Sequence, residues 1–179
     1  MLEFNYELKV PKERIPILIG SGGEIKKQIE EATETSLKIS SEEGEVSISG
    51  RDNLKLYTAR EIVRSIGRGF NPDIALLLLK SDYSCETISI GDFVKTKQHL
   101  QRLKGRVIGE EGKARKYIEE LTSTHISVYG KTISIIGEVQ DVMNARKAID
   151  QLLTGSMHKT VYRFLEQKRT EKRKAKTFV

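Results

Sequence analysis

Two glycine-rich turns contain the residue types best suited to binding an anion. Residues 20–23 read Gly-Ser-Gly-Gly and residues 109–112 read Gly-Glu-Glu-Gly, so a Gly-x-x-Gly pattern occurs twice, 89 positions apart. Glycine leaves the backbone N–H groups unobstructed and allows positive φ. Because each turn leads into a helix-forming stretch with several Lys or Arg residues, its amides and the following helix N-terminus favour an anion such as phosphate.

The match between the two turns extends beyond their glycines. Residues 29–31 (Ile-Glu-Glu) recur at 118–120, Thr33 recurs as Thr122, and position 35 matches position 124. A single glycine turn is a weak signal, because joints between helices use glycine routinely. The signal is strong in this chain, because the glycine turn occurs twice at one offset within the same order of elements.

Motifs for other chemistries do not fit this sequence. A Walker-type loop needs Gly-Lys-Ser/Thr after four intervening residues, and a dinucleotide loop needs a glycine three residues after Gly22, where Ile25 stands. The histidines at 99, 125 and 158 lack partners at ligand spacing. No acidic pair joins a Ser, Cys or His nucleophile arrangement. We therefore expect no metal site, no cofactor and no catalytic residues.

The elements that must position the first turn follow the order β-α-α-β-β-α. Residues 2–10 alternate apolar and polar types, from Leu2 to Val10, which is typical of a half-buried strand. Pro11 permits a short helix up to the turn. Asp52 is the expected N-cap of the last helix. The apolar residues of the middle helix, the two short strands and the last helix are Ile25, Ile29, Ala32, Leu37, Ile39, Val46, Ile48, Leu54, Ile62, Val63 and Ile66.

The second copy repeats this order. Ile88 and Ile90 indicate its first strand, and residues 97–108 the helix before the turn. The next helix, the two strands and the closing helix are indicated by Ala114, Ile118, Leu121, Ile126, Val128, Ile133, Ile135, Val142, Ile149, Leu152 and Leu153. We therefore divide the chain into a first domain (1–69), a connector helix (70–82), a second domain (83–157) and a basic C-terminal tail (158–179).

The net charge of +6 resides in the tail. From His158 onward there are eight Lys/Arg and two Glu, whereas residues 1–157 hold 23 basic and 23 acidic side chains. Val161, Phe164 and Leu165 indicate that the first turns of the tail pack as a helix, so the tail is partly helical. It is either an RNA-binding arm or a solvated charged end, and both interpretations remain open.

Bulk features point to a cytoplasmic protein without a membrane span. The longest purely apolar run is six residues, Ile74 to Leu79, far shorter than a membrane helix. No basic-then-apolar leader opens the sequence. Cys85 is the single cysteine and fits a reducing cytosol.

The repeated segments resemble the KH domain in its type I form. The first copy matches through residues 19–23 followed by Ile25 and Ile29, and the second through residues 105–112 followed by Ile118. The resemblance covers residues 2–155. Gly112-Lys113-Ala114-Arg115, residues 145–149 and Leu153-Thr154-Gly155 are similar to one group, the tandem KH-domain small-subunit ribosome-assembly factors, in their archaeal form.

The resemblance implies an α+β fold of two consecutive KH domains, each with a three-stranded antiparallel sheet packed on three helices. It also implies single-stranded RNA binding, near the 3′ end of small-subunit rRNA. The implied protein partners are the alpha subunit of initiation factor two and the PIN-domain endonuclease that trims this rRNA. We further expect a monomer with no enzymatic activity.

In KH domains the turn clamps the backbone of about four nucleotides, and an apolar groove beside it receives the bases. The groove floor would be Leu18, Ile19, Ile25, Ile29 and Ile39, or Val107, Ile108, Ala114, Ile118 and Val128. Carried onto this chain, the RNA-binding residues are Arg14, Ile19, Gly20, Ser21, Gly22, Gly23, Ile25, Lys26, Lys27, Lys38, Lys104, Arg106, Ile108, Gly109, Gly112, Lys113, Arg115 and Lys116.

Two departures from the family pattern affect these expectations. Pro16 stands where the family usually has glycine, which would alter the first helix. Glu110 and Glu111 stand where small or basic residues are usual, and each costs a bound phosphate about 1 kcal/mol. Residues 95–116 nevertheless hold eight basic and two acidic side chains. We therefore expect the first copy to bind RNA by its loop and the second by its basic rim.

The basic residues after each turn also have a simpler interpretation. Lys26, Lys27, Arg115 and Lys116 each precede a glutamate by four residues, so they could form helix-surface ion pairs. Lys113 has no glutamate at position 117 and is the better RNA candidate.

Two rival functions remain open. A protein-interaction adaptor, whose second domain docks protein rather than RNA, would show little RNA binding at any salt concentration. An RNA-processing enzyme would need about another hundred residues for a catalytic domain.

Overall fold

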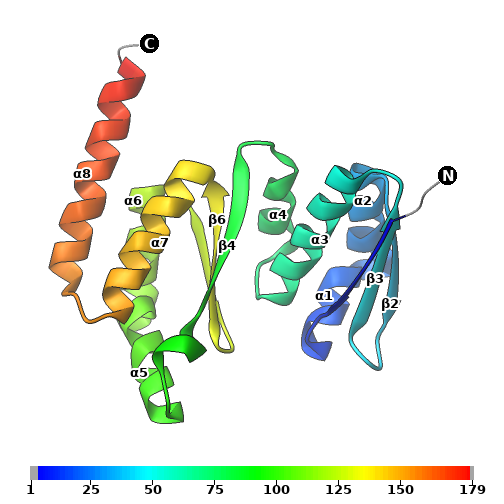
Figure 1. Ribbon diagram of the computed structural model, residues 1–179, viewed down its shortest axis with the longest axis horizontal. Coiled ribbons are helices and arrows are strands. Elements are labelled where there is room, and N and C mark those ends of the chain that lie inside the picture. Colours follow the sequence, from blue (N-terminus) through cyan, green and yellow to red (C-terminus); the bar gives the residue numbers. More distant parts are fainter. Residues whose placement is uncertain (1–3, 178–179) are drawn as a thin grey trace. The chain divides into compact units, whose positions relative to one another are not determined.

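Each half of the chain folds into a three-stranded antiparallel sheet with helices on one face (Figure 1). The computed structural model describes residues 4–177, and the chain divides into two units between Tyr83 and Ser84. Leu2, expected in the first strand, lies outside the described residues. None of the helices in the described part of the chain is long and apolar enough to span a membrane.

The first unit has the expected order of elements. Strand β1 (Phe4–Lys9) leads through a 3₁₀ turn (Lys12–Arg14) to helix α1 (Ile15–Ile19), the glycine turn (Ser21–Gly23) and helix α2 (Glu24–Thr33). Strands β2 (Ser36–Ser40) and β3 (Glu45–Gly50) and helix α3 (Asn53–Gly67) follow. The sheet order is β1-β3-β2, so β3 is central and β1 and β2 are edge strands.

The period-two pattern of β3 separates the core from solvent. Val46 and Ile48 point toward the helices and are buried, and they pair across the sheet with Ile39 and Leu37. The core between this face and the helices also contains Leu18, Ile29, Leu56, Ile62 and Ile66, all fully buried. The expected helix residue Leu54 is 74% exposed and does not join this core.

Asp52 is the N-cap of α3, as expected. Its carboxylate accepts hydrogen bonds from the amides of Lys55 (3.1 Å) and Leu54 (2.8 Å). These bonds lower the pKa of Asp52 below its ordinary value of 3.8. The helix therefore begins where the sequence predicted.

The second unit repeats the architecture. Strand β4 (Tyr83–Ser89), a 3₁₀ turn (Ile90–Phe93), helix α5 (Lys97–Ile108), the second glycine turn (Glu110–Gly112) and helix α6 (Lys113–Thr122) come first. Strands β5 (His125–Tyr129) and β6 (Thr132–Glu138) and helix α7 (Val139–Leu153) follow, in the sheet order β4-β6-β5. The assignment of Ile90 to the strand was wrong, because it begins the 3₁₀ turn that leads to α5.

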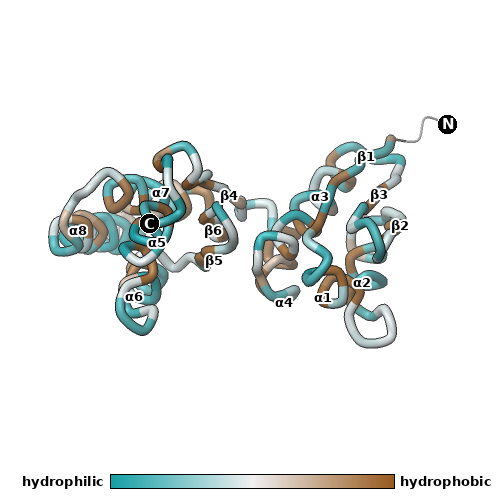
Figure 2. The backbone as a smooth tube through the Cα atoms, turned by 90° about the horizontal axis from the view of Figure 1, so that it is seen from below, coloured by the Kyte–Doolittle hydropathy of each residue, from teal (hydrophilic) through white to brown (hydrophobic). Residues whose placement is uncertain are grey.

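Two further segments complete the units. Helix α4 (Pro72–Ala75) and a 3₁₀ turn (Leu76–Leu79) pack on α3 and belong to the first unit. Helix α8 (His158–Thr177) packs on α6 and α7, with Val161 and Leu165 buried in the second core. The helix thus runs much further than the first turns that the sequence indicated. Figure 2 shows apolar residues in brown on α1, β5 and β6, where the cores lie.

The repeated threonines tie the middle helix of each unit to the next strand. Thr33 Oγ1 donates to the carbonyl of Ile29 (2.7 Å) and shares a hydrogen bond with Thr35 Oγ1 (2.7 Å). Thr122 and Thr124 repeat this arrangement. All four threonines are buried. Part of the sequence repeat therefore specifies the fold rather than a binding site.

Candidate nucleic-acid interface

The first glycine of each turn is required by close packing. Gly20 (φ 75°, ψ 176°) and Gly109 (φ 73°, ψ 176°) adopt the same backbone conformation. A Cβ on Gly20 would lie 2.5 Å from Cγ1 of Ile25, and a Cβ on Gly109 would lie 2.5 Å from Cβ of Ala114. These glycines let the chain reverse directly against the helix that follows.

The later residues of each turn face open space. Gly22 and Gly23 have φ of 59° and 81°, and a Cβ on either would meet nothing within 4 Å. Gly112 (φ 74°) is equally open. Glu111 adopts φ 51° at the position equivalent to Gly22, a left-handed conformation that costs a non-glycine residue about 1 kcal/mol. The outer surface of both turns is therefore accessible to a ligand.

The charges at the two turns differ in place but not in sum. Ser21 is replaced by Glu110, Gly22 by Glu111, and Glu24 by Lys113, so each set carries one net negative charge. Lys113 Nζ lies 3.3 Å from a carboxylate oxygen of Glu111. Although Lys113 has no glutamate four residues later in the helix, it is thus paired with an acidic residue of the turn.

Apolar surface lies beside each turn. Of the expected groove residues, Leu18, Ile29, Val107 and Ile118 are fully buried, and Ala114 is 6% exposed. Only the half-buried members can meet a ligand, and these are Ile19, Ile25, Ile39, Ile108 and Val128. Ile19 and Ile25 flank the first turn and Ile108 flanks the second, while Ile39 and Val128 lie on the edge strands β2 and β5.

The edge strands offer main-chain hydrogen-bonding groups beside this surface. The amide of Leu37 in β2 turns away from β3 and donates to Glu30 Oε1 (2.7 Å). Along an antiparallel strand, every second residue directs its N–H and C=O away from the partner strand. Ile39, two residues after Leu37, therefore also turns these groups toward the open edge. Ile126 donates to Glu119 in the same way, and Val128 repeats Ile39.

A lysine-lined hollow lies between the first turns of α5 and the β5–β6 turn. Its volume is about 530 Å³, and Lys95, Lys97, Lys104 and Lys131 line it without an acidic residue. Lys131 was missed by the sequence analysis, because it lies in the hairpin 27 residues after Lys104. The sequence feature that could have identified Lys131 is its place in the turn Gly130-Lys131, which joins β5 and β6 beside this hollow.

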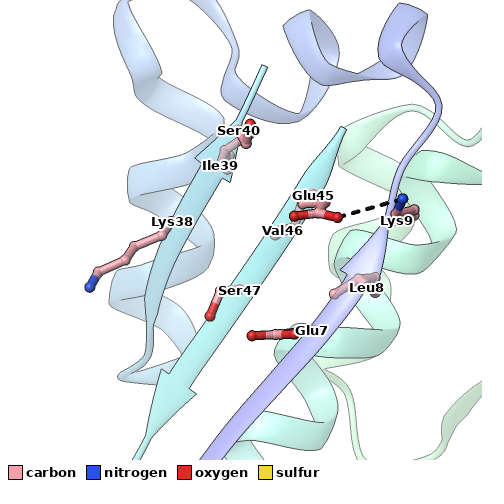
Figure 3. A pocket seen from close by; sticks show the side chains of 9 residues that line it. All are labelled: Glu7, Leu8, Lys9, Lys38, Ile39, Ser40, Glu45, Val46 and Ser47. Carbon is pink, nitrogen blue, oxygen red and sulfur yellow. Dashed lines mark ion pairs between the residues drawn. The ribbon is translucent and has the colours of Figure 1, made fainter. Parts of the chain in front are cut away.

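One hollow of the first unit differs from this lysine-lined hollow in charge and in place (Figure 3). It has a volume of about 560 Å³ and is lined by residues of all three strands, near the turn that joins β2 and β3. Glu7, Ser47 and Lys38 form one cross-strand row, and Lys9 pairs with Glu45 (3.5 Å). Because neighbouring strand residues point to opposite faces, Lys38 lies on the face away from the helices. The fold does not bring Lys38 to the turn.

Arg14 and Arg106 each hold the end of a helix. Arg14 donates from Nε to the carbonyl of Ile66 (2.8 Å) and from Nη2 to that of Phe70 (2.6 Å). Arg106 donates to the carbonyls of Leu152 (3.0 Å) and Ser156 (2.5 Å). These contacts satisfy carbonyls at the ends of α3 and α7. Both guanidinium groups are thus engaged within the protein, and their contact with RNA stays a prediction.

The remaining basic residues mostly follow the simpler interpretation. Helix-surface pairs form between Lys26 and Glu30 (3.9 Å), Lys27 and Glu31 (3.8 Å), and Arg115 and Glu119 (4.0 Å). Lys116 is exposed and has no ion pair among residues 4–177. Pro16 lies in the first turn of the short helix α1, where its missing N–H costs nothing. In the described part of the chain, no group of three His, Cys, Asp or Glu could hold a metal.

Comparison with known proteins gives two family matches. A model described as KH domain matches residues 5–65, and one described as eukaryotic type KH-domain (KH-domain type I) matches residues 84–170. Neither describes an enzyme. The KH domain-containing protein MJ0443 of Methanocaldococcus jannaschii is 46% identical over 173 residues, which are 94% of this chain and 76% of that protein.

Two further relatives carry names that refer to RNA. The RNA-binding protein pno-1 of Caenorhabditis briggsae is 33% identical over 114 residues, which are 62% of this chain and 41% of that protein. The structure of the a/eIF2alpha-aDim2p-rRNA complex from Pyrococcus horikoshii OT3 contains a chain with a TM-score of 0.88 at 42% identity. The match covers 94% of this chain and 96% of that one. The prediction of two type I KH domains is confirmed.

Proposed function

This chain belongs to the family of tandem KH-domain rRNA-processing factors that includes archaeal Dim2p and pno-1, and on that premise we propose that it binds single-stranded RNA through both units during small-subunit assembly. It has no catalytic role in this proposal. The observation that carries the proposal is the pair of turns whose outer surfaces are open, each beside accessible apolar side chains and an open strand edge.

The RNA strand would run across each turn with its phosphates near the turn amides. Bases would rest on the half-buried isoleucines and on Val128. The main-chain groups of Ile39 and Val128 would then bond to base edges, which KH domains read on single strands. Glu30 and Glu119 would stay outside this contact, because each is already bonded to a strand amide.

The two units would contribute differently. The first turn has a short side chain at Ser21 and none at Gly22, so its backbone can approach a phosphate closely. The second turn has two carboxylates, and the four lysines of its hollow would supply the attraction instead. Lys116 is exposed on α6 and would add to this basic rim.

The proposed RNA is the 3′ end of small-subunit rRNA, and the proposed protein partners are the alpha subunit of initiation factor two and a PIN-domain endonuclease. An rRNA ligand and the initiation-factor partner are supported by a relative whose structure was determined with a/eIF2alpha and rRNA. We propose that the protein acts as a monomer in the cytoplasm.

Single-strand affinity measured at several salt concentrations tests this function. Gly22→Asp should fold, because aspartate tolerates φ 59° and a Cβ at this position would meet nothing within 4 Å. The added carboxylate should repel a phosphate and lower the RNA affinity about tenfold. Lys95→Gln/Lys97→Gln/Lys131→Gln should reduce the salt slope by about two, since each phosphate contact contributes about 0.7. Lys12→Gln/Arg51→Gln/Lys80→Gln removes three charges elsewhere and is the control. Unchanged affinity in both test variants would refute RNA binding at these sites.

One observation favours a second function, that of a protein adaptor. Glu110 and Glu111 make the second turn acidic, which suits a basic protein surface better than a phosphate. If the adaptor function is correct, the wild-type chain binds the alpha subunit of initiation factor two and shows no affinity for single-stranded RNA even at low salt.

A further inference from the structure

Helix α8 turns its apolar and aromatic side chains toward the second unit. Val161 and Leu165 are buried. The ring of Tyr162 meets that of Tyr117 edge-on, with centroids 4.7 Å apart, and Phe164 lies under Lys147 (5.1 Å). The two aromatic side chains of the described part of α8, Tyr162 and Phe164, are half-buried against the second unit, and its only exposed apolar residue is Ala175.

The charges of α8 are only partly used within the protein. Lys168 pairs with Glu171 (2.7 Å). Lys172 lies 2.6 Å from Asp141 and 3.0 Å from Glu138. The remaining six cations are exposed and have no ion pair among residues 4–177, and we call them the α8 basic face: Lys159, Arg163, Arg169, Arg173, Lys174 and Lys176.

The α8 basic face extends along the whole helix. A helix of 20 residues is about 30 Å long, so its cations can reach several successive phosphates of a nucleic acid. Lys172 pairs with Asp141 in the first turn of α7 and with Glu138, the N-cap of that helix. The C-terminal end of α8, which contains Arg173, Lys174 and Lys176, extends beyond α7 (Figure 1).

We propose that the α8 basic face binds the phosphate backbone of base-paired RNA adjoining the single strand that the turns hold, an inference that rests on the proposed function. Proteins that bind single strands place the bases on aromatic side chains or, as proposed for the two turns, on apolar ones, and the exposed surface of α8 offers few of either. The outer face offers cations without such rings, and double-stranded RNA is recognised mainly by its shape, phosphates and 2′-hydroxyls. The occupant that fits this face is therefore a duplex rather than a single strand.

The contacts of α8 hold this face at a fixed position beside the second turn. The ring of His158 hydrogen bonds to the carbonyl of Arg106, three residues before Gly109 (2.7 Å). Tyr117 in α6 donates its hydroxyl to Glu166 (2.8 Å), and this bond raises the pKa of Tyr117. Helix α8 is thus bonded to both helices that flank the turn. A duplex on α8 and a strand on the turn would be held in one geometry.

The test uses Arg163→Gln/Arg169→Gln/Arg173→Gln in the full chain, with Lys12→Gln/Arg51→Gln/Lys80→Gln as the matched loss of three charges. The probes are a blunt RNA duplex of about 16 base pairs, a single strand of about ten nucleotides, and the duplex carrying that strand as a 3′ overhang. The α8 variant should bind both duplex probes at least about tenfold more weakly at about 0.1 M salt, with a salt slope reduced by two to three. Its affinity for the single strand should change by less than about twofold.

Two outcomes would overturn the proposal. One is that the α8 variant binds the duplex as tightly as the control variant does. The other is that the α8 variant loses as much affinity for the single strand as for the duplex, which would mean that α8 attracts any nucleic acid without selectivity. Lys159→Gln/Lys174→Gln/Lys176→Gln removes the other cations of the face and must give the same result. Failure of the wild-type chain to bind the single strand would reject the proposed function, while the blunt duplex would still decide the role of α8.

Discussion

At the scale of the residue, the glycines of the two turns fall into two kinds. Gly20 and Gly109 are held by a neighbouring side chain that leaves no space for a Cβ. Gly22, Gly23 and Gly112 are required only by their positive φ, and the space beyond them is open. The first kind maintains the fold of the turn, and the second kind keeps its outer surface free.

Alanine at the two kinds of position should have different effects on stability. Gly109→Ala should lower the free energy of unfolding by about 3 kcal/mol, because the strained backbone and the clash with Ala114 each cost about 1–3 kcal/mol. Gly112→Ala should lower the free energy of unfolding by only about 1 kcal/mol, because the left-handed backbone is strained but the new methyl group meets no neighbour. Urea unfolding followed by circular dichroism measures both. Equal losses would mean that the turn relaxes around the new methyl group.

Removing the acidic side chains of the second turn should strengthen RNA binding. Glu110→Ser/Glu111→Gly restores the residue types of the first turn and releases Lys113 from its pair. Two carboxylates near a phosphate cost about 1 kcal/mol each, so affinity for a single strand should rise about tenfold or more. Fluorescence anisotropy measures this change, and Glu120→Ser, which removes an exposed charge from α6, is the control. Weaker binding by the double variant would point to a protein partner at this turn.

At the scale of the element, periodicity predicted the strands and helices well, because one face of each is buried. Arg14 and Arg106 show where the sequence pattern is insufficient. Arg14 stands six residues before Gly20 and Arg106 three before Gly109, yet both bond to carbonyls at the end of the last helix. Their common role follows from the fold, so aligning the repeats does not reveal it. The same holds for Lys131, which reaches the hollow only through hairpin pairing.

The bond between helix α6 and strand β5 should contribute measurably to stability. Glu119 accepts from the amide of Ile126, and removing the acceptor leaves a half-buried N–H without a partner. Glu119→Ala should therefore destabilise the protein by about 1–2 kcal/mol, whereas Glu119→Gln keeps an acceptor oxygen and should cost less than half as much. Thermal unfolding compares the two. Equal destabilisation would assign the effect to the ion pair with Arg115 instead.

At the scale of the whole molecule, the sequence indicates two units, and their cores are separate clusters of apolar residues. The extent of α8 could not be predicted, because half of its residues are charged and their pattern does not distinguish a helix from a solvated end. Tertiary contacts of Val161, Leu165 and Lys172 decide it.

Leu165→Ala should loosen the second unit and leave the first unchanged. The buried leucine contributes to the second core, so its truncation should cost about 3 kcal/mol. Hydrogen exchange should accelerate at the amides of α5, α6 and α7 and stay unchanged in β1, β2 and β3. Thr160→Ala, on the exposed side of α8, is the control. Equal acceleration in both units would show that they unfold together.

The concentration of net charge on one helix also affects how fast and in which orientation the protein meets a polyanion. Residues 1–157 are electrically balanced, so the long-range field of the molecule originates from α8. Because this field decays over about 8 Å at physiological ionic strength, capture begins with α8 nearest to the polyanion. Added salt should therefore slow association far more than it speeds release.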